Sequence, residues 1–130
     1  MSDLLSIYNE IVVALRAEED SVTLQYFHPD FVVYEDPGMP YGGVFKGGMS
    51  FIELRRKVRK IWNLSFIAKC EEAGGNTFVA VFKATGVPGG PTDSMETVVT
   101  VVWTFDGRQA LEARVIYYDT PRLAAALAKS

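Results

Sequence analysis

Four long runs typical of β-strands fill the second half of the chain, and they constrain the fold more than any other feature. The runs cover residues 63–72, 77–87, 93–105 and 109–118. Gly74-Gly75-Asn76 separates the first two runs, Asp106-Gly107-Arg108 separates the last two, and both segments are typical of tight turns. The sequence therefore predicts two hairpins in one antiparallel sheet.

Helical patterns precede this sheet. Residues 3–17 carry apolar side chains at helical spacing on one side, namely Leu4, Tyr8, Ile11 and Leu15. We expect a shorter helix over residues 21–27, ended by His28-Pro29, a third helix from about residue 48 or 50, and a closing helix after Thr120. Helices followed by a mainly antiparallel sheet define the α+β class, and residues 1–130 fit a single domain.

A cluster of cations lies in the expected third helix, between Arg55 and Lys60. One interpretation is a phosphate-binding site. The favoured interpretation is a solvated helix face, because cations stabilise the C-terminal end of a helix.

Alternation along the last two strands predicts which sheet face is buried. Val101 and Trp103 share one face, and Tyr117 belongs to the same face of the next strand. A two-residue turn would place Val101 opposite Glu112 and mix the faces. We therefore predict a three-residue loop, which pairs Trp103 with Leu111 and Val101 with Ala113. The opposite face remains too apolar for comfortable exposure, since it carries Val98, Val102, Ile116 and Tyr118.

The segment from Tyr26 to Lys46 is the candidate functional stretch. A short strand over residues 31–35 ends at Asp36, and a Gly/Pro-rich loop follows. Alternation places Tyr34 and Asp36 on one face of this strand and Glu35 on the other. A carboxylate at a strand end beside aromatic rings can be partly desolvated, which raises its pKa toward that of a working base. Asp36 is thus the leading catalytic candidate; the alternative is a loop cap that accepts backbone N–H groups.

At these residues the chain resembles the SnoaL-like branch of the nuclear transport factor 2 (NTF2-like) superfamily, which includes ketosteroid isomerases and polyketide cyclases. The resemblance rests on His28-Pro29-Asp30, Glu35-Asp36-Pro37-Gly38 and residues 42–47, and it extends over nearly the whole chain. It implies a cystatin-like cone, in which N-terminal helices pack on a curved, mainly antiparallel sheet around an apolar pocket. It also implies a homodimer that is formed through the outer sheet face.

The resemblance further implies cofactor-independent proton transfer beside the carbonyl of a small hydrophobic compound, with Asp36 as general base. The sequence departs from the isomerase pattern at Val101, where isomerases carry an acid. It departs again at Ile11, near the place of the oxyanion tyrosine, so that Tyr8 is the candidate substitute on the same helix. A non-catalytic ligand-binding or dimerisation module of the same fold is the alternative function.

For each of the remaining candidate site residues, a structural role is the alternative to a functional one. His28 is a proton shuttle or an architectural turn residue, and Asp119 is a second acid or a helix cap. Aromatic residues can stack on a flat ligand. The predicted catalytic residues are Asp36, His28 and Tyr8, and the predicted pocket residues are Tyr26, Tyr34, Val101, Trp103, Tyr117 and Asp119.

Composition excludes several classes of function. A net charge of −3 and a pI of about 5.1 favour neither nucleic acid nor an anionic membrane as partner. Cys70 is the only cysteine and His28 the only histidine, so an intramolecular disulfide is impossible and a His/Cys zinc site lacks ligands. We expect no metal, and the resemblance implies that no cofactor is needed. No run approaches the roughly 20 apolar residues of a membrane span, and the N-terminus lacks a basic region, so we expect a cytoplasmic protein.

Overall fold

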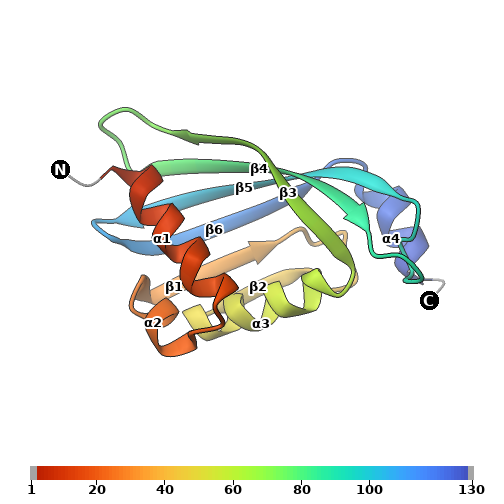
Figure 1. Cartoon of the computed structure of the whole chain (residues 1–130), viewed down its shortest axis with the longest axis horizontal. Coiled ribbons are helices and arrows are strands. Elements are labelled where there is room, and N and C mark those ends of the chain that lie inside the picture. Colours follow the sequence, from red (N-terminus) through yellow and green to blue (C-terminus); the bar gives the residue numbers. More distant parts are fainter. Residues whose placement is uncertain (1–2, 129–130) are drawn as a thin grey trace.

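The computed structural model describes residues 3–128, which form four helices and one six-stranded sheet (Figure 1). The elements are α1 (Leu4–Arg16), α2 (Asp20–Leu24), β1 (Phe27–Glu35), β2 (Gly43–Lys46), α3 (Gly48–Arg59), β3 (Trp62–Glu71), β4 (Thr77–Gly86), β5 (Glu96–Asp106), β6 (Gln109–Tyr117) and α4 (Thr120–Ala128). The predicted α+β class is confirmed. In the described part of the chain, no helix has the length and apolar character needed to cross a membrane.

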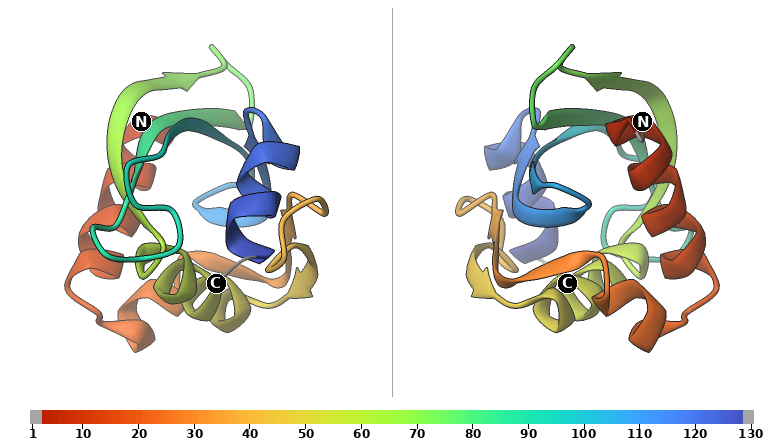
Figure 2. Two further views of the ribbon diagram at one scale, coloured as in Figure 1. Left: turned by 90° about the vertical axis from the view of Figure 1, so that its right-hand side faces the viewer. Right: turned by 90° about the vertical axis from the view of Figure 1, so that its left-hand side faces the viewer.

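The sheet is curved and unclosed. Its strand order is β2-β1-β6-β5-β4-β3, in which β1 runs parallel to β6 and all other neighbours are antiparallel. Viewed end-on, the sheet forms an incomplete ring, and α1 and α3 close the open side (Figure 2). Side chains from the helices and from the concave sheet face therefore meet in the middle of the domain.

Helix α1 forms as its sequence predicts. The Asp3 side chain caps it by accepting a hydrogen bond from the Ser6 backbone N–H at 2.7 Å. Its buried side carries Tyr8 and Ile11, and the Tyr8 ring stacks on Phe78 of β4 with 4.5 Å between ring centroids. The amphipathic pattern thus anchors the helix on the sheet.

The β5–β6 hairpin has the predicted inner face but not the predicted register. Asp106 pairs with Gln109, so that the loop has two residues, and Trp103 pairs with Ala113 rather than with Leu111. Val101 pairs with Val115, and a register shift after Thr104 takes Leu111 out of the ladder. A bulge within the strand, instead of a longer loop, keeps like faces together.

Strand β1 begins earlier than predicted and presents its other face to the interior. It starts at Phe27, so His28-Pro29 lies within the strand and does not end a helix. Glu35 is buried on the same face of β1 as Val33. Tyr34 lies on the outer face, where its ring centroid is 4.1 Å from Arg114 Cζ. The prediction that Tyr34 and Asp36 occupy the inner face is therefore wrong. The strand β2 was also not predicted, because its residues follow the Gly/Pro loop.

Candidate active site

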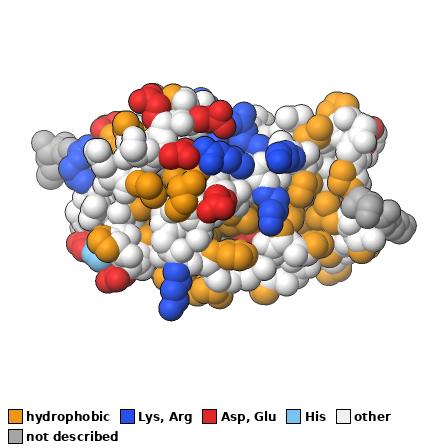
Figure 3. All heavy atoms as spheres, turned by 90° about the horizontal axis from the view of Figure 1, so that it is seen from below, with side chains coloured by type: hydrophobic (Ala, Val, Ile, Leu, Met, Phe, Trp, Pro, Cys, Tyr) orange, Lys and Arg blue, Asp and Glu red, His pale blue; other side chains and the backbone are white. Residues whose placement is uncertain are grey.

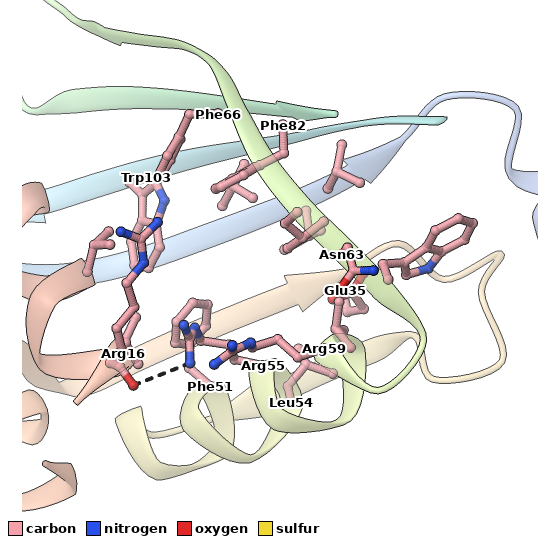
Figure 4. A pocket seen from close by; sticks show the side chains of 18 of the residues that line it. Arg16, Glu35, Phe51, Leu54, Arg55, Arg59, Asn63, Phe66, Phe82 and Trp103 are labelled. Atoms are coloured by element: carbon pink, nitrogen blue, oxygen red, sulfur yellow. Dashed lines mark hydrogen bonds between the residues drawn. The ribbon is translucent and has the colours of Figure 1, made fainter. Parts of the chain in front are cut away.

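A cavity of about 250 Å³ lies between the concave sheet face and helices α1 and α3 (Figure 4). Its volume is below the roughly 300–1,000 Å³ of sites for drug-sized ligands, which limits an occupant to a small molecule. Four predicted residues line it, namely Tyr8, Val101, Trp103 and Tyr117. Most of the remaining lining is apolar, including Val12, Leu15, Phe51, Leu54, Val58 and Phe66.

Glu35 brings an acidic group to this apolar lining. Its side chain comes from the end of β1 and is only 2% exposed, and its Oε1 atom has no hydrogen-bond partner among the described residues. Burial raises the pKa of Glu35 to about 8, and the negative charge of Asp36 adds to the rise. The Asp36 backbone N–H and the Tyr117 hydroxyl oppose that rise only partly. Glu35 therefore titrates near neutral pH.

A chain of buried hydrogen bonds ends beside this carboxyl. Trp62 Nε1 donates to the Tyr41 hydroxyl at 3.2 Å, and the Tyr41 hydroxyl donates to the Tyr117 hydroxyl at 2.7 Å. Burial raises the pKa of Tyr41 to about 12 and raises that of Tyr117 as well, so both phenols stay protonated near neutral pH. Since Tyr117 accepts from Tyr41, its own proton is free to point at Glu35 or at a ligand oxygen.

The loop between β1 and β2 supplies Tyr41, which the sequence analysis did not single out. This loop folds back tightly, since Met39 N–H donates to Asp36 O at 3.1 Å and Gly42 N–H donates to Met39 O at 2.8 Å. A Cβ atom on Gly42 would lie 2.0 Å from the Asp36 carbonyl oxygen, so only glycine fits there. Two large side chains, Met39 and Tyr41, within a Gly/Pro-rich loop were the available signal of a buried loop.

No protein-family model and no curated protein matches the sequence, but solved structures do. An NTF2-like protein from Burkholderia thailandensis superimposes with a TM-score of 0.77 at 19% identity, over 98% of each chain. The chain has the NTF2-like fold. A putative SnoaL-like polyketide cyclase from Shewanella putrefaciens matches with a TM-score of 0.66 at 13% identity, over 100% of this chain and 88% of that one. TerC, co-crystallised with polyporic acid, matches with a TM-score of 0.70 at 19% identity, over 95% of this chain and 99% of that one.

In this NTF2-like domain Asp36 does not line the cavity. Its Oδ1 atom accepts from Gly38 N–H at 3.0 Å, and its Oδ2 atom accepts from the Thr120 hydroxyl at 2.7 Å and from Tyr117 N–H at 3.3 Å. The expectation that this carboxylate faces the cavity is therefore wrong, because the inward position at this strand end belongs to Glu35. The contacts match the alternative that we predicted, a cap of the following loop, and they also tie that loop to α4.

His28 lies away from the cavity lining as well. Its Nδ1 atom accepts from Asp30 N–H at 3.0 Å, and its Nε2 atom lies 3.6 Å from an Asp106 carboxylate oxygen. These contacts hold the irregular start of β1, so the architectural interpretation fits the geometry better than a proton shuttle. In residues 3–128, no group of three or more histidine, cysteine or acidic side chains is placed to hold a metal ion.

Three predicted pocket residues lie outside the lining. Tyr26 donates its hydroxyl proton to Glu10 at 2.9 Å on the surface, and Tyr34 lies on the outer sheet face. Asp119 Oδ2 accepts from Arg122 Nε at 2.7 Å, where α4 begins. The predicted set therefore divides: the residues from α1, β5 and the inner face of β6 line the cavity, and the others do not.

The basic run of α3 is only partly a solvated helix face. Arg55 and Arg59 line the cavity together with Arg16 of α1. In Figure 4 Arg16 extends from α1 toward Trp103, and Arg55 and Arg59 lie along the cavity side of α3. Arg55 is half-buried, whereas Arg16 and Arg59 are exposed at the rim of the cavity. Lys57 and Lys60 are exposed as well but do not contribute to the lining. The cavity thus combines apolar walls, one buried acid and three guanidinium groups.

Proposed function

We propose that this domain is an enzyme that transfers a proton on a small hydrophobic carbonyl compound bound in the cavity, without a cofactor. The observation that carries the proposal is the buried Glu35 carboxyl, which faces the cavity and has a pKa raised to about 8. A group with a pKa near the working pH can both accept and return a proton. Glu35 takes the role that the resemblance suggested for Asp36.

Ionised Glu35 would remove the proton from the carbon next to the carbonyl. The electron pair of that C–H bond would move onto the carbonyl oxygen and form an enolate. The Tyr117 hydroxyl, which accepts from Tyr41, would donate to this oxygen, since protonated phenols in an apolar site stabilise developing negative charge. Protonated Glu35 would then return the proton to a carbon of the enolate, which regenerates the carboxylate.

The test is hydrogen–deuterium exchange of 2-tetralone in deuterated buffer, followed by NMR, because proton removal beside a carbonyl is the step in question. We expect the wild type to accelerate exchange, and Glu35→Gln to lower the accelerated rate by about 10²–10⁴-fold. Asp36→Asn is the matched control, since it neutralises the adjacent carboxylate outside the cavity. Equal rates for Glu35→Gln and the wild type would contradict the proposal.

A non-catalytic ligand-binding module is the second candidate. The observation that favours it is that two buried polar atoms of lining residues, Glu35 Oε1 and Trp103 Nε1, lack partners among the described residues. A bound ligand can satisfy both without any reaction. In that case 2-tetralone exchange would stay at the rate of buffer alone while the cavity still bound hydrophobic compounds.

We also propose a homodimer through the outer sheet face, which leaves large apolar side chains exposed. Ile116 is 53% exposed and Tyr118 75% exposed. Burying such side chains against a second copy removes apolar surface from water. We expect a dimer by sedimentation at tens of micromolar, and monomers or aggregates for Val102→Lys combined with Ile116→Lys; a wild-type monomer would contradict this assignment.

The cytoplasmic location of the protein likewise stays a prediction.

A further inference from the structure

We infer that the ligand of the cavity is an anion: a small aromatic or otherwise flat hydrophobic molecule whose carboxylate-like group meets Arg16, Arg55 and Arg59. The inference deepens the proposed function, on which it rests only in that the cavity binds a ligand. It names a substrate class that the acid–base site by itself does not require.

The three guanidinium groups converge on one cavity from two helices. Arg55 and Arg59 are one turn apart on α3 and so lie on the same side of that helix, and Arg16 ends α1. Burial lowers the pKa of Arg55, and the positive charges of Arg59 and Arg16 lower it further, while Glu18 offsets part of this effect. Like charges crowd here although the chain as a whole has a net charge of −3.

Arg56, on the same helix, differs from the three cavity arginines because it is paired with carboxylates. One of its guanidinium nitrogens donates to both carboxylate oxygens of Asp20, at 2.7 and 2.9 Å, and its Nε lies 3.7 Å from Glu18. Among the described residues, none of the three cavity arginines forms an ion pair. Arg55 donates only to the Leu15 carbonyl, at 3.4 Å. The donors of this cluster therefore suit an anion that arrives from outside.

Aromatic rings beside the cluster provide a surface for the rest of the ligand. Trp103 packs edge-on against Phe51 at 5.0 Å between centroids, and the Arg16 guanidinium carbon lies 6.0 Å from the Phe66 ring centroid. Trp103 is 2% exposed, and its Nε1 donor has no partner among the described residues. A flat ligand with an oxygen acceptor fits this combination of rings and an unsatisfied donor.

The arrangement also orients a ligand toward the acid. In the view of Figure 4, Arg16 and Glu35 lie at opposite ends of the cavity, with Arg55 and Arg59 between them. On the underside of the domain, Lys and Arg side chains lie among Asp and Glu side chains and next to hydrophobic ones (Figure 3). An acidic group held near Arg16 and Arg55 leaves the body of the ligand directed toward Glu35.

The test compares 2-naphthoate with 2-naphthamide, which share size and shape but differ in charge, by tryptophan fluorescence or calorimetry. We expect the wild type to bind the acid at least about tenfold more tightly than the amide, with a smaller ratio at high salt. Arg55→Gln combined with Arg59→Gln should bring the ratio close to one, mainly because the acid binds more weakly.

Lys57→Gln combined with Lys60→Gln is the matched control, because it removes the same charge near the end of α3 from residues that do not line the cavity. This control should keep the preference for the acid. Arg16→Gln serves as a second variant, and should lower the ratio, if the double arginine variant does not fold by circular dichroism. Equal affinity of the wild type for both probes, no binding of either probe, or an unchanged ratio in the folded arginine variants would overturn the inference.

The two proposals fail separately. A preference for naphthoate without 2-tetralone exchange would contradict the enzyme and support the anion site. Exchange that depends on Glu35, with equal binding of both naphthalenes, would support the enzyme and overturn the anion site.

Discussion

Two adjacent carboxylates, Glu35 and Asp36, lie in two regions with opposite solvation. Glu35 faces an apolar cavity, where one carboxylate oxygen lacks a partner and the pKa rises to about 8. Asp36 faces the junction of its own loop with α4, where three donors surround the carboxylate. Successive side chains in a strand point to opposite faces. For this reason one of the two neighbouring carboxylates is desolvated and the other is hydrogen-bonded. The same functional group is thus desolvated on one side of the strand and holds a loop in place on the other.

The largest expected contrast is in the pH dependence of proton exchange. If Glu35 must be ionised, the accelerated 2-tetralone exchange should rise about tenfold per pH unit below pH 8 and level off above it. Between pH 6 and pH 8 the rise is then roughly 50-fold, since half of Glu35 is ionised at a pH equal to its pKa. Asp36→Asn should keep the rise but move its midpoint to a lower pH, because it removes a charge that raises the pKa of Glu35, and Glu35→Gln should abolish the rise. A flat profile in the wild type would remove Glu35 from the mechanism.

The next contrast concerns stability as a function of pH. The pKa of Glu35 is about 8 in the folded chain and about 4.5 when exposed, so between these values the folded state holds a proton that the unfolded state has released. The contribution of Glu35 to the free energy of unfolding is therefore fully present below pH 4.5. It should decrease by roughly 1 kcal/mol per pH unit up to pH 8. Urea titrations of the wild type and Glu35→Gln across this range should converge at low pH and diverge at high pH.

Asp36→Asn tests the architectural half of the comparison. The change removes the charge that strengthens hydrogen bonds from Gly38, Tyr117 and Thr120, so the free energy of unfolding should fall by about 2 kcal/mol at pH 7. Thr120→Val removes a single donor and should cost about half as much. Chemical denaturation measures both. Unchanged stability in Asp36→Asn would show that the junction contributes little.

Tyr41→Phe should have the smallest effect. It removes one hydroxyl from the chain that joins Trp62 to Tyr117, which should lower the free energy of unfolding by about 1 kcal/mol. Exchange should slow only modestly, since Tyr117 keeps its own proton. A loss as large as that of Glu35→Gln would instead place Tyr41 at the reacting oxygen.

Much of the fold follows from local patterns. The spacing of apolar residues in 3–17 predicts α1, and alternation in 93–105 predicts that Val101 and Trp103 face the interior, as the structure confirms. Alternation in β1 likewise separates Tyr34 and Asp36 from Glu35. These features depend on periodicities of 3.6 and 2 residues, which the sequence carries by itself.

Only the tertiary structure decided which face of β1 points inward. Phe31 and Val33 on one face are balanced by Val32 and Tyr34 on the other, so apolar content could not choose between them. The choice comes from the parallel pairing with β6, where Glu35 stands in register with the buried Val115. Paired residues in a sheet point to the same face, so the neighbouring strand buries the acid.

Long-range packing also assembles the remainder of the candidate site. Tyr41 meets Tyr117 across 76 positions of the chain, and Arg16 meets Arg55 and Arg59 only because α1 and α3 close the same side of the curved sheet. Helical spacing predicts that Arg55 and Arg59 share a side of α3, but not that this side faces a cavity. The sequence by itself therefore determined the elements and their alternation. The pairing of strands and the closure by helices decided which side chains meet, since both depend on contacts between residues far apart in the chain.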